Sequence, residues 1–244
     1  MQIEREKEKV KEIFKDLVFN EKAHSYFVGN RQYISVSTQL KKFYTPFDDI
    51  EIAPHSAAKW NRNHPFKPKK NAADLLAEWK AIADEACDRG HRVHLFGENY
   101  PIFKEVTCIQ EEAIVQYYND LNPKYVVFFL ELQMYSPELN YSGTGDIILW
   151  NNETGKISIR DWKTNKDLHN NFKEQKMLEP FEDMLDCPLN HYYLQLNLYK
   201  MLIENMTDLE VEDMEIIWLK ETNDKLYQTF KVPDLTEKLL PYYE

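Results

Sequence analysis

Three β-rich segments follow one another closely between residues 124 and 164, and this block constrains the fold most. KYVVFFLELQMYS (124–136) is followed by YSGTGDIILW (141–150) and then by KISIRDWKT (156–164). The last two segments are joined by NNETG, whose Asn and Gly residues favour a tight turn. Short connections of this kind join antiparallel neighbours, so the pattern predicts an antiparallel meander of three strands.

The segments after the meander predict a fold of the α/β class. Residues 188–205 are strongly apolar and open on Pro188, which favours a helix start. Residues 211–220 and 225–232 then predict two strands, and residues 236–244 a short terminal helix. This order predicts one mixed central sheet flanked by helices.

The N-terminal part is predicted to be mainly helical, with one hairpin. Helical spacing of apolar residues covers 3–17, 71–98 and 108–120. Residues 18–37 contain two β-rich runs around a Gly29-Asn30 turn, which predicts a hairpin.

Two connections in this part are less regular. Residues 35–44 are expected to start a short helix with Ser37 or Thr38 as its N-cap. Residues 45–70, which contain several prolines, are expected to be irregular. Asn71 is the expected N-cap of the long helix that follows.

Bulk composition excludes several classes of protein. The chain has 30 basic and 41 acidic residues and a formal net charge of −11, which argues against a general nucleic-acid binder but not against a local basic groove. No apolar run approaches the roughly 20 residues of a membrane span, so we expect a cytoplasmic protein without membrane association. The three cysteines form no CxxC pair, so we expect buried thiols rather than disulfides or a structural zinc site.

One stretch has the composition of a binding segment for a single nucleic-acid strand. KWNRNHPFKPKK, residues 59–70, contains five basic residues, two large aromatic residues and no acid. Positive charge grips a phosphate backbone and aromatic rings stack on bases. A solvated basic loop fits the same composition equally well. The candidate binding residues are Lys59, Trp60, Arg62, Phe66, Lys67, Lys69 and Lys70.

The predicted meander also brings acidic residues and a lysine toward one another. Asp146 and Asp161 lie on neighbouring segments, and Glu131 lies on the segment before them. Asp161 and Lys163 are two residues apart, so their side chains share a face of the strand. Carboxylates that hold Mg²⁺ beside a lysine supply the parts needed to hydrolyse a phosphodiester. A D-x-K triplet alone is also typical of an ordinary surface salt bridge.

Other residues favour the catalytic interpretation. His94 and Glu98 are four apart on one helix face, and Gln195 and Tyr199 repeat that spacing. A lone histidine is more often structural, but a histidine one turn after Gly90, in a chain with a carboxylate cluster, makes His94 a candidate metal ligand. Ordinary helix polarity also accounts for Gln195 and Tyr199.

Two glycine positions predict close contacts. Gly143-Thr144-Gly145 precedes Asp146, which suits a backbone close to a substrate. Gly90, inside the long helix, predicts the close approach of a neighbouring helix or a ligand.

Five of these motifs, taken in order, resemble the PD-(D/E)xK nuclease superfamily. They are GHRVH, LELQ, GTGDIIL, IRDWKT and YLQLNLY. The set is most similar to the RecB-like exonuclease branch and, within it, to the group of the mitochondrial genome-maintenance exonuclease with its phage and bacterial relatives. KAHSYFVGNRQYISVSTQL also resembles the N-terminal hairpin of that group.

The resemblance implies a role for each matching residue. His94, Asp146 and Asp161, with the backbone carbonyl of Trp162, would be metal ligands, and Lys163 would be the catalytic lysine. Glu131 would assist the site. Gln195 and Tyr199 match the motif after the core, and Ser35 and Ser37 match a segment near the phosphates.

The resemblance also implies an architecture and an activity. It implies a single domain, 1–244, with a restriction-endonuclease-like core sheet at 124–232 and an N-terminal hairpin and helical DNA-gripping insertion at 20–100. The implied activity is a DNA nuclease dependent on one or two Mg²⁺ or Mn²⁺ ions, expected to be an exonuclease that acts on single-stranded DNA ends in replication, recombination or repair. The insertion would cover the site, which favours strand binding by residues 59–70.

Partners, location and alternatives follow from the same resemblance. A recombinase, a helicase or a single-strand-binding protein would be a partner, in a bacterial or phage-infected cell. Some RecB-like members hold an iron–sulfur cluster on one cysteine before the core and three after it. This chain has no cysteine after Cys187, so we expect no cluster. A structure-specific endonuclease of the same fold and a non-catalytic DNA-end-binding accessory protein remain alternatives.

Overall fold

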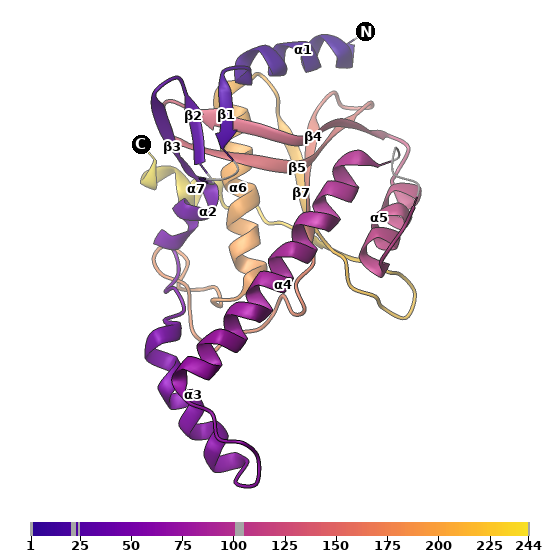
Figure 1. The fold of residues 1–244 in the computed structure, drawn as a ribbon. Coiled ribbons are helices and arrows are strands. Elements are labelled where there is room, and N and C mark those ends of the chain that lie inside the picture. The colour runs from indigo at the N-terminus through magenta and orange to yellow at the C-terminus, as the bar shows by residue number, and fades with distance from the viewer. Residues whose placement is uncertain (1, 21–22, 24, 101–104, 244) are drawn as a thin grey trace.

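The computed structural model describes residues 2–20, 23, 25–100 and 105–243. It is an α/β structure with one mixed sheet flanked by helices, as the order of the segments predicted (Figure 1). Four residues of predicted elements lie outside the described part: Glu21, Lys22 and His24 of the hairpin and Glu244 of the terminal helix. No helix in the described ranges has both the length and the apolar character needed to cross a bilayer.

The strands form one eight-stranded sheet with both parallel and antiparallel pairs. β4 pairs antiparallel with β5 and β5 with β6, which confirms the predicted meander. β6 and β7 are parallel neighbours, and so are β3 and β5. The strands are β1 (Leu17–Asn20), β2 (Ser25–Val28), β3 (Arg31–Ser35), β4 (Tyr125–Ser136), β5 (Tyr141–Asn151), β6 (Ile157–Lys163), β7 (Val211–Trp218) and β8 (Gln228–Lys231).

The predicted hairpin is confirmed as β2 and β3, which are antiparallel and flank Gly29. Gly29 has a φ of +56°, a left-handed conformation that glycine adopts without steric cost. β1 pairs antiparallel with β2 and adds a third strand to this unit.

β5 is the branch point of the sheet. β4 pairs with one edge of β5 along its length. The other edge is shared, because β3 pairs with Tyr141 and Ser142 while β6 pairs with residues 147–150. Residues 143–146 lie between these two partners, where β3 and β6 separate. We call this gap the sheet fork.

Helices cover both faces of the sheet. Alternate β5 residues point to opposite faces, so Ile148 packs in the core beneath α6 while Ile147 packs beneath α4 and α5. The helices are α1 (Gln2–Phe14), α2 (Val36–Gln39), α3 (Asp49–Asn63), α4 (Ala72–Asn99), α5 (Ile109–Asp120), α6 (Pro188–Met206) and α7 (Thr236–Leu239), with 3₁₀ turns at Leu40–Lys42 and Leu240–Tyr242.

Residues 45–70 contain a helix, so the prediction that they are irregular is wrong for 49–63. Asp48 is the N-cap of α3, and its carboxylate accepts a hydrogen bond of 2.8 Å from the Glu51 N–H. Pro54 lies inside the helix, where it removes one backbone donor without ending the helix. Pro54 argued against a helix here, although the N-cap residue Asp48 is a helix-start signal in the sequence.

Two smaller expectations are also corrected. Ser35 caps α2 by accepting a hydrogen bond from the Thr38 N–H, so neither Ser37 nor Thr38 is the cap. The expectation of three buried thiols holds for Cys187 but is wrong for Cys87, which is exposed on α4, and for Cys108, which is half-buried.

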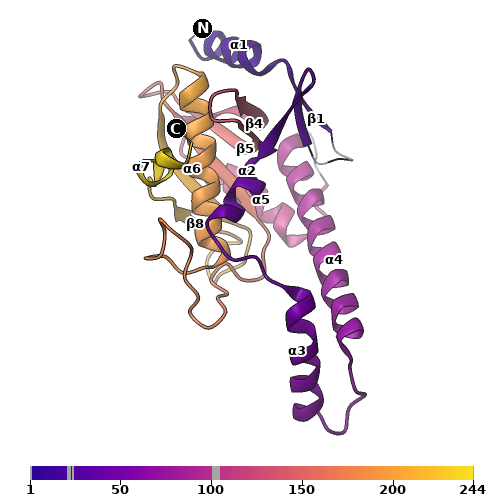
Figure 2. The same cartoon turned by 90° about the vertical axis from the view of Figure 1, so that its left-hand side faces the viewer.

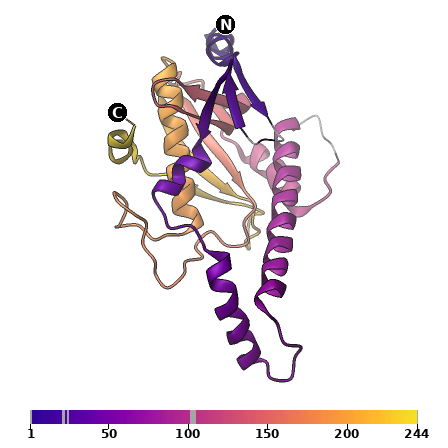
Figure 3. The ribbon, with the colours of Figure 1, turned by 60° about the vertical axis from the view of Figure 1, so that its left-hand side comes forward.

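α3 and α4 form a helical hairpin that projects from the sheet (Figures 2 and 3). We call this hairpin the arm, and residues 59–70 its tip. Asn71 caps α4 as predicted, in a capping box with Asp74. His94 lies 22 residues after Ala72 on α4, a distance of about 33 Å at 1.5 Å per residue. The tip is therefore far from the residues that α4 brings to the sheet.

Candidate metal centre

Three carboxylates form a row across the middle of the sheet. The register of both ladders, extended by one residue from Ile147, puts Asp146 between Glu131 on β4 and Asp161 on β6. Asp146 lies at the sheet fork, where β5 is leaving the β6 ladder. Like charges in opposing positions repel one another, so this row needs positive charge nearby.

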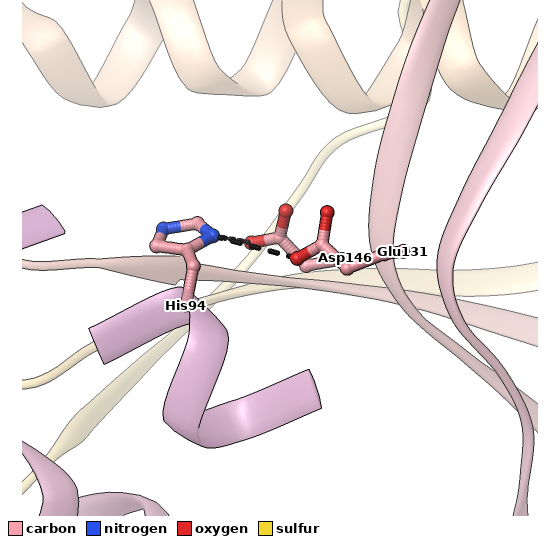
Figure 4. Close-up of side chains that lie close together, drawn as sticks. All are labelled: His94, Glu131 and Asp146. Carbon is pink, nitrogen blue, oxygen red and sulfur yellow. Dashed lines mark ion pairs between the residues drawn. The ribbon is translucent and has the colours of Figure 1, made fainter. Parts of the chain in front are cut away.

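His94 on α4 supplies one positive partner (Figure 4). Its Nδ1 lies 3.3 Å from Asp146 Oδ2 and 3.8 Å from Glu131 Oε1. The potential ligand atoms of these three residues all lie within 4.8 Å of one another. Burial lowers the pKa of His94, but Asp146 and Glu131 outweigh burial and raise it to about 10. The positive charge of His94 neutralises the same carboxylates that a metal cation would neutralise.

Glu131 has an unusual backbone conformation. Its φ is +48°, in the left-handed region that non-glycine residues rarely adopt. Leu130 packs in the core beneath α4 and α5, while Leu132 packs in the core beneath α6, so the alternation of faces along β4 breaks at Glu131. Strain of this kind costs about 1–3 kcal/mol and is typical of functional sites. Here it accompanies a side chain aimed at His94 and Asp146.

Asp161 and Lys163 share a face of β6, as predicted, and form a buried ion pair. Burial, and then the neighbouring Asp146, raise the pKa of Asp161 to about 6. Asp161 Oδ1 is buried and accepts no hydrogen bond from the described residues. A buried carboxylate oxygen without a donor is suited to a cation.

Asp146 is held by the strand beside it. Its Oδ2 accepts a hydrogen bond of 2.8 Å from the backbone N–H of Trp162. Burial opposes ionisation, yet His94 and Lys163 keep the pKa of Asp146 below its ordinary value. The Trp162 ring points to the opposite face of β6, into the core beneath α4 and α5.

α6 places a second group of residues beside the lysine. Gln195 Nε2 donates a hydrogen bond of 2.8 Å to Tyr199 Oη, so the predicted pair does meet. Burial and then the Asp161 carboxylate raise the pKa of Tyr199 well above its usual range, which places this phenol beside the carboxylates. A Cβ added to Gly143 would lie 2.6 Å from the Tyr199 ring. The close contact expected at this glycine is therefore made by the Tyr199 ring and not by a substrate.

Tyr192 is a site residue that the sequence analysis missed. Lys163 Nζ lies 4.1 Å from the centre of its ring, a cation–π contact. The Tyr192 hydroxyl donates a hydrogen bond of 2.9 Å to Asn165 Oδ1. Tyr192, Gln195 and Tyr199 follow i, i+3, i+7 spacing on α6, a signal that could have identified it.

The N-terminal hairpin borders the sheet fork from the other side. Ser35 pairs with Ser142 in the β3–β5 ladder, and Ser35 Oγ lies 2.9 Å from Ser37 Oγ. The Tyr26 hydroxyl lies 2.9 Å from Thr144 Oγ1 in the fork. Both predicted serines therefore stand at the edge of the fork.

The basic stretch 59–70 lies at the arm tip and does not cover the site. Phe66 is fully exposed, at 100% of its surface. Trp60 is less available, because His64 stacks on it at 3.9 Å and Lys70 Nζ lies 4.4 Å from its ring centre. Lys70 also pairs with Glu78. Lys59, Arg62, Lys67 and Lys69 form no ion pair with a described residue.

The predicted site residues therefore fall into two groups, one at the sheet fork and one at the arm tip. The carboxylates of Glu131, Asp146 and Asp161 meet His94 and Lys163 at the sheet fork. Gln195 and Tyr199 on α6 lie beside this group. Glu131, not Asp161, groups with His94 and Asp146 in the compact set. One imidazole and several carboxylate oxygens are suitable ligands for Mn²⁺, and the carboxylates also for Mg²⁺. The residues present fit such an ion.

A comparison with protein-family models finds no match, and a comparison with curated proteins finds none either.

Proposed function

We propose that this protein is a metal-dependent DNA nuclease with a restriction-endonuclease-like core. The observation that carries the proposal is the carboxylate row of Glu131, Asp146 and Asp161, which meets His94 on one side and the buried Lys163 on the other. A salt bridge alone accounts for Asp161 and Lys163, but it does not account for two further carboxylates and a histidine beside them.

Each group has a chemical task in this proposal. His94, Asp146, Glu131 and Asp161 hold one or two Mg²⁺ or Mn²⁺ ions, with the Trp162 carbonyl as a further ligand. Bound metal neutralises phosphate charge and lowers the pKa of attacking water. Lys163 orients that water or stabilises the charge that develops on the phosphate.

The substrate we propose is single-stranded DNA with a free end. The chain carries a net charge of −11, so phosphates meet repulsion over much of its surface. The arm tip is an exception, because its five basic residues come without an acid in residues 59–70. We propose that the strand runs from the sheet fork along the arm, with Ser35 and Ser37 beside its phosphates.

The test is digestion of end-labelled single strands, duplexes and closed single-stranded circles, with Mg²⁺, with Mn²⁺ and with EDTA. Single strands should be degraded from their ends only with metal, and circles should survive. Lys163→Ala and Asp161→Asn should each lower the cleavage rate by about 10²-fold or more. Lys156→Ala is a matched control, because Lys156 pairs with Glu210 at the surface.

Thermal unfolding of each variant separates loss of chemistry from loss of the fold. Full activity of a folded Lys163→Ala protein would falsify the mechanism. Cleaved circles would identify an endonuclease instead. Binding without metal, and without products after long incubation in Mn²⁺, would identify a DNA-end-binding accessory protein.

A further inference from the structure

An open pocket lies where the arm leaves the sheet. It has a volume of about 420 Å³ and lies between the start of α3, the segment 164–187 and the first turn of α6. We call it the arm-base pocket. The lining residues used in the argument are Tyr44, Phe47, Asn170, Phe172, Gln175 and His191.

The pocket presents aromatic rings to solvent. Phe47 is 65% exposed and Phe172 is 62% exposed, although each comes from a different segment of the chain. Tyr44 and His191 stack on one another with ring centres 4.0 Å apart. Large exposed rings gathered in one concave place are typical of a binding site.

The segment 164–187 carries Phe172 and forms one wall of the pocket. It is long, but contacts with the rest of the fold hold it in place. Residues 164–187 form no helix and no strand beyond the bridge between Lys176 and Leu185. The backbone N–H of Leu178 donates a hydrogen bond of 2.8 Å to the Phe43 carbonyl, and Phe181 is fully buried. Ordered connections longer than roughly 12–15 residues are uncommon and usually functional.

The pocket and the candidate metal centre border the same part of α6. His191 in the pocket is followed on α6 by Tyr192, whose ring lies 4.1 Å from Lys163 Nζ. The Tyr192 hydroxyl donates to Asn165, at the start of the segment that forms the wall. Two neighbouring residues of α6, His191 and Tyr192, therefore contact the pocket and the lysine of the metal centre, respectively.

The charge of the lining selects the kind of group that fits. Among the described residues, the lining contains the carboxylates of Asp48, Glu51 and Asp186 and no lysine or arginine, and the nearby Lys173 Nζ lies 4.9 Å from the centre of the Phe172 ring. Such a lining repels a phosphate. It suits a flat, uncharged ring that carries N–H donors, because aromatic faces stack on it while carboxylates and amides accept its hydrogen bonds.

We propose that the arm-base pocket binds one nucleobase of the substrate strand, next to the nucleotide at the metal centre. The base stacks on Phe47 and Phe172, while its phosphates stay outside. This inference rests on the proposed nuclease function. Bases with an exocyclic amino group, namely adenine, cytosine and guanine, bind better than thymine.

The experiment measures binding of the full-length chain to single strands in EDTA, so that no cleavage occurs. A single 2-aminopurine, moved one position at a time from the end of the strand, reports stacking by loss of its fluorescence. We expect quenching at one position, and recovery of fluorescence there in Phe47→Ala and Phe172→Ala. Each variant should bind about 10-fold more weakly.

Val18→Ala is the matched control, because Val18 is an exposed apolar residue on β1, outside the pocket. It should keep both the affinity and the quenching. Strands of adenine and of thymine, compared on the wild-type chain, test the preference for amino-bearing bases.

Three results would overturn the inference, and they differ in which part of the proposed function they leave intact. Unchanged affinity and quenching in both phenylalanine variants, with cleavage that still depends on Lys163, removes the base pocket and keeps the nuclease. A wild-type chain that neither binds nor cleaves single strands removes both. Competition by a basic peptide, without any effect of single strands on the pocket, would assign the pocket to a protein partner and overturn the inference.

Discussion

At the scale of single residues, the sheet fork concentrates negative charge that the fold alone does not need. Glu131, Asp146 and Asp161 stand side by side, and Glu131 holds a left-handed backbone. His94 and Lys163 balance part of this charge. The buried like charges of Asp146 and Asp161, beside the strained Glu131, are costly, and such a cost is usually tolerated for function.

Asp161 makes the metal-free protein less stable as pH rises. Its pKa is about 6 in the folded chain against an ordinary 3.8, so the folded state keeps the proton to a higher pH than the unfolded state. Stability from this group is therefore present below about pH 4 and lost by about pH 6. Asp161→Asn cannot titrate, and it should gain up to about 3 kcal/mol relative to wild type across that window.

Urea unfolding of both proteins in EDTA, at pH values across this window, measures the difference. Comparison of the two proteins cancels the carboxylates that lie away from Asp161 and titrate in the same range. If the unfolding free energies of the two proteins changed in parallel with pH, the pKa of Asp161 would not be raised in the folded state.

At the scale of elements, one glycine fixes how α4 lies on the sheet. A Cβ added to Gly97 would lie 2.7 Å from Trp162 Nε1, so α4 approaches β6 closely only because this side chain is absent. Gly90 differs, because its nearest neighbour would be Thr164 Oγ1 at 3.8 Å, an ordinary contact. The close approach of a protein neighbour that Gly90 predicted occurs at Gly97 instead. This contact sets the position of His94, three residues earlier.

Alanine at these two glycines should have opposite effects. Gly97→Ala forces Trp162 or α4 to move and should cost about 1–3 kcal/mol of unfolding free energy. Gly90→Ala fits the space and should gain about 0.5–1 kcal/mol, because alanine favours a helix interior over glycine. Chemical denaturation measures both. Equal losses in the two variants would contradict the difference in packing.

At the scale of the whole molecule, the arm separates a cationic tip from an acidic centre. The tip and His94 are about 33 Å apart along α4, by the rise of the helix. A stacked strand covers that distance in about ten nucleotides at 3.4 Å each. The proposed function therefore makes binding depend on strand length.

Removal of charge at the tip should weaken the binding of long strands only. Lys59→Gln, Lys67→Gln and Lys69→Gln together should lower affinity and reduce the dependence of log affinity on log salt by about 2. Strands much shorter than ten nucleotides should bind the triple variant and wild type equally, because they do not reach the tip. Fluorescence anisotropy at several salt concentrations measures both effects.

The matched control replaces Lys9 and Lys11 on α1 and Lys15 directly after it, which carry the same charge far along the chain from the arm. This control should leave the salt dependence unchanged. Equal weakening of short and long strands by the tip variant would contradict a strand that runs along the arm.

The local patterns of the sequence determined the elements that have strong local signals. The meander, the hairpin at Gly29, the Asn71 cap and the apolar helix from Pro188 follow from alternation, turn residues and caps, which act within a few residues. Asp161 and Lys163 share a face for the same reason, since side chains on a strand repeat every two residues. α3 was missed because Pro54 reads locally as a helix breaker.

The tertiary structure decided everything that depends on distant segments. Only the shared edge of β5 creates the fork where Asp146 lies, and only the packing of Gly97 on Trp162 brings His94 to it. The tertiary structure also groups Glu131, rather than Asp161, with His94. It places the basic stretch 59–70 at the end of the arm (Figure 2). Sequence determines which chemical groups a chain owns and their local geometry. Their meeting across long stretches of chain is set by strand pairing and close packing, which no local pattern encodes.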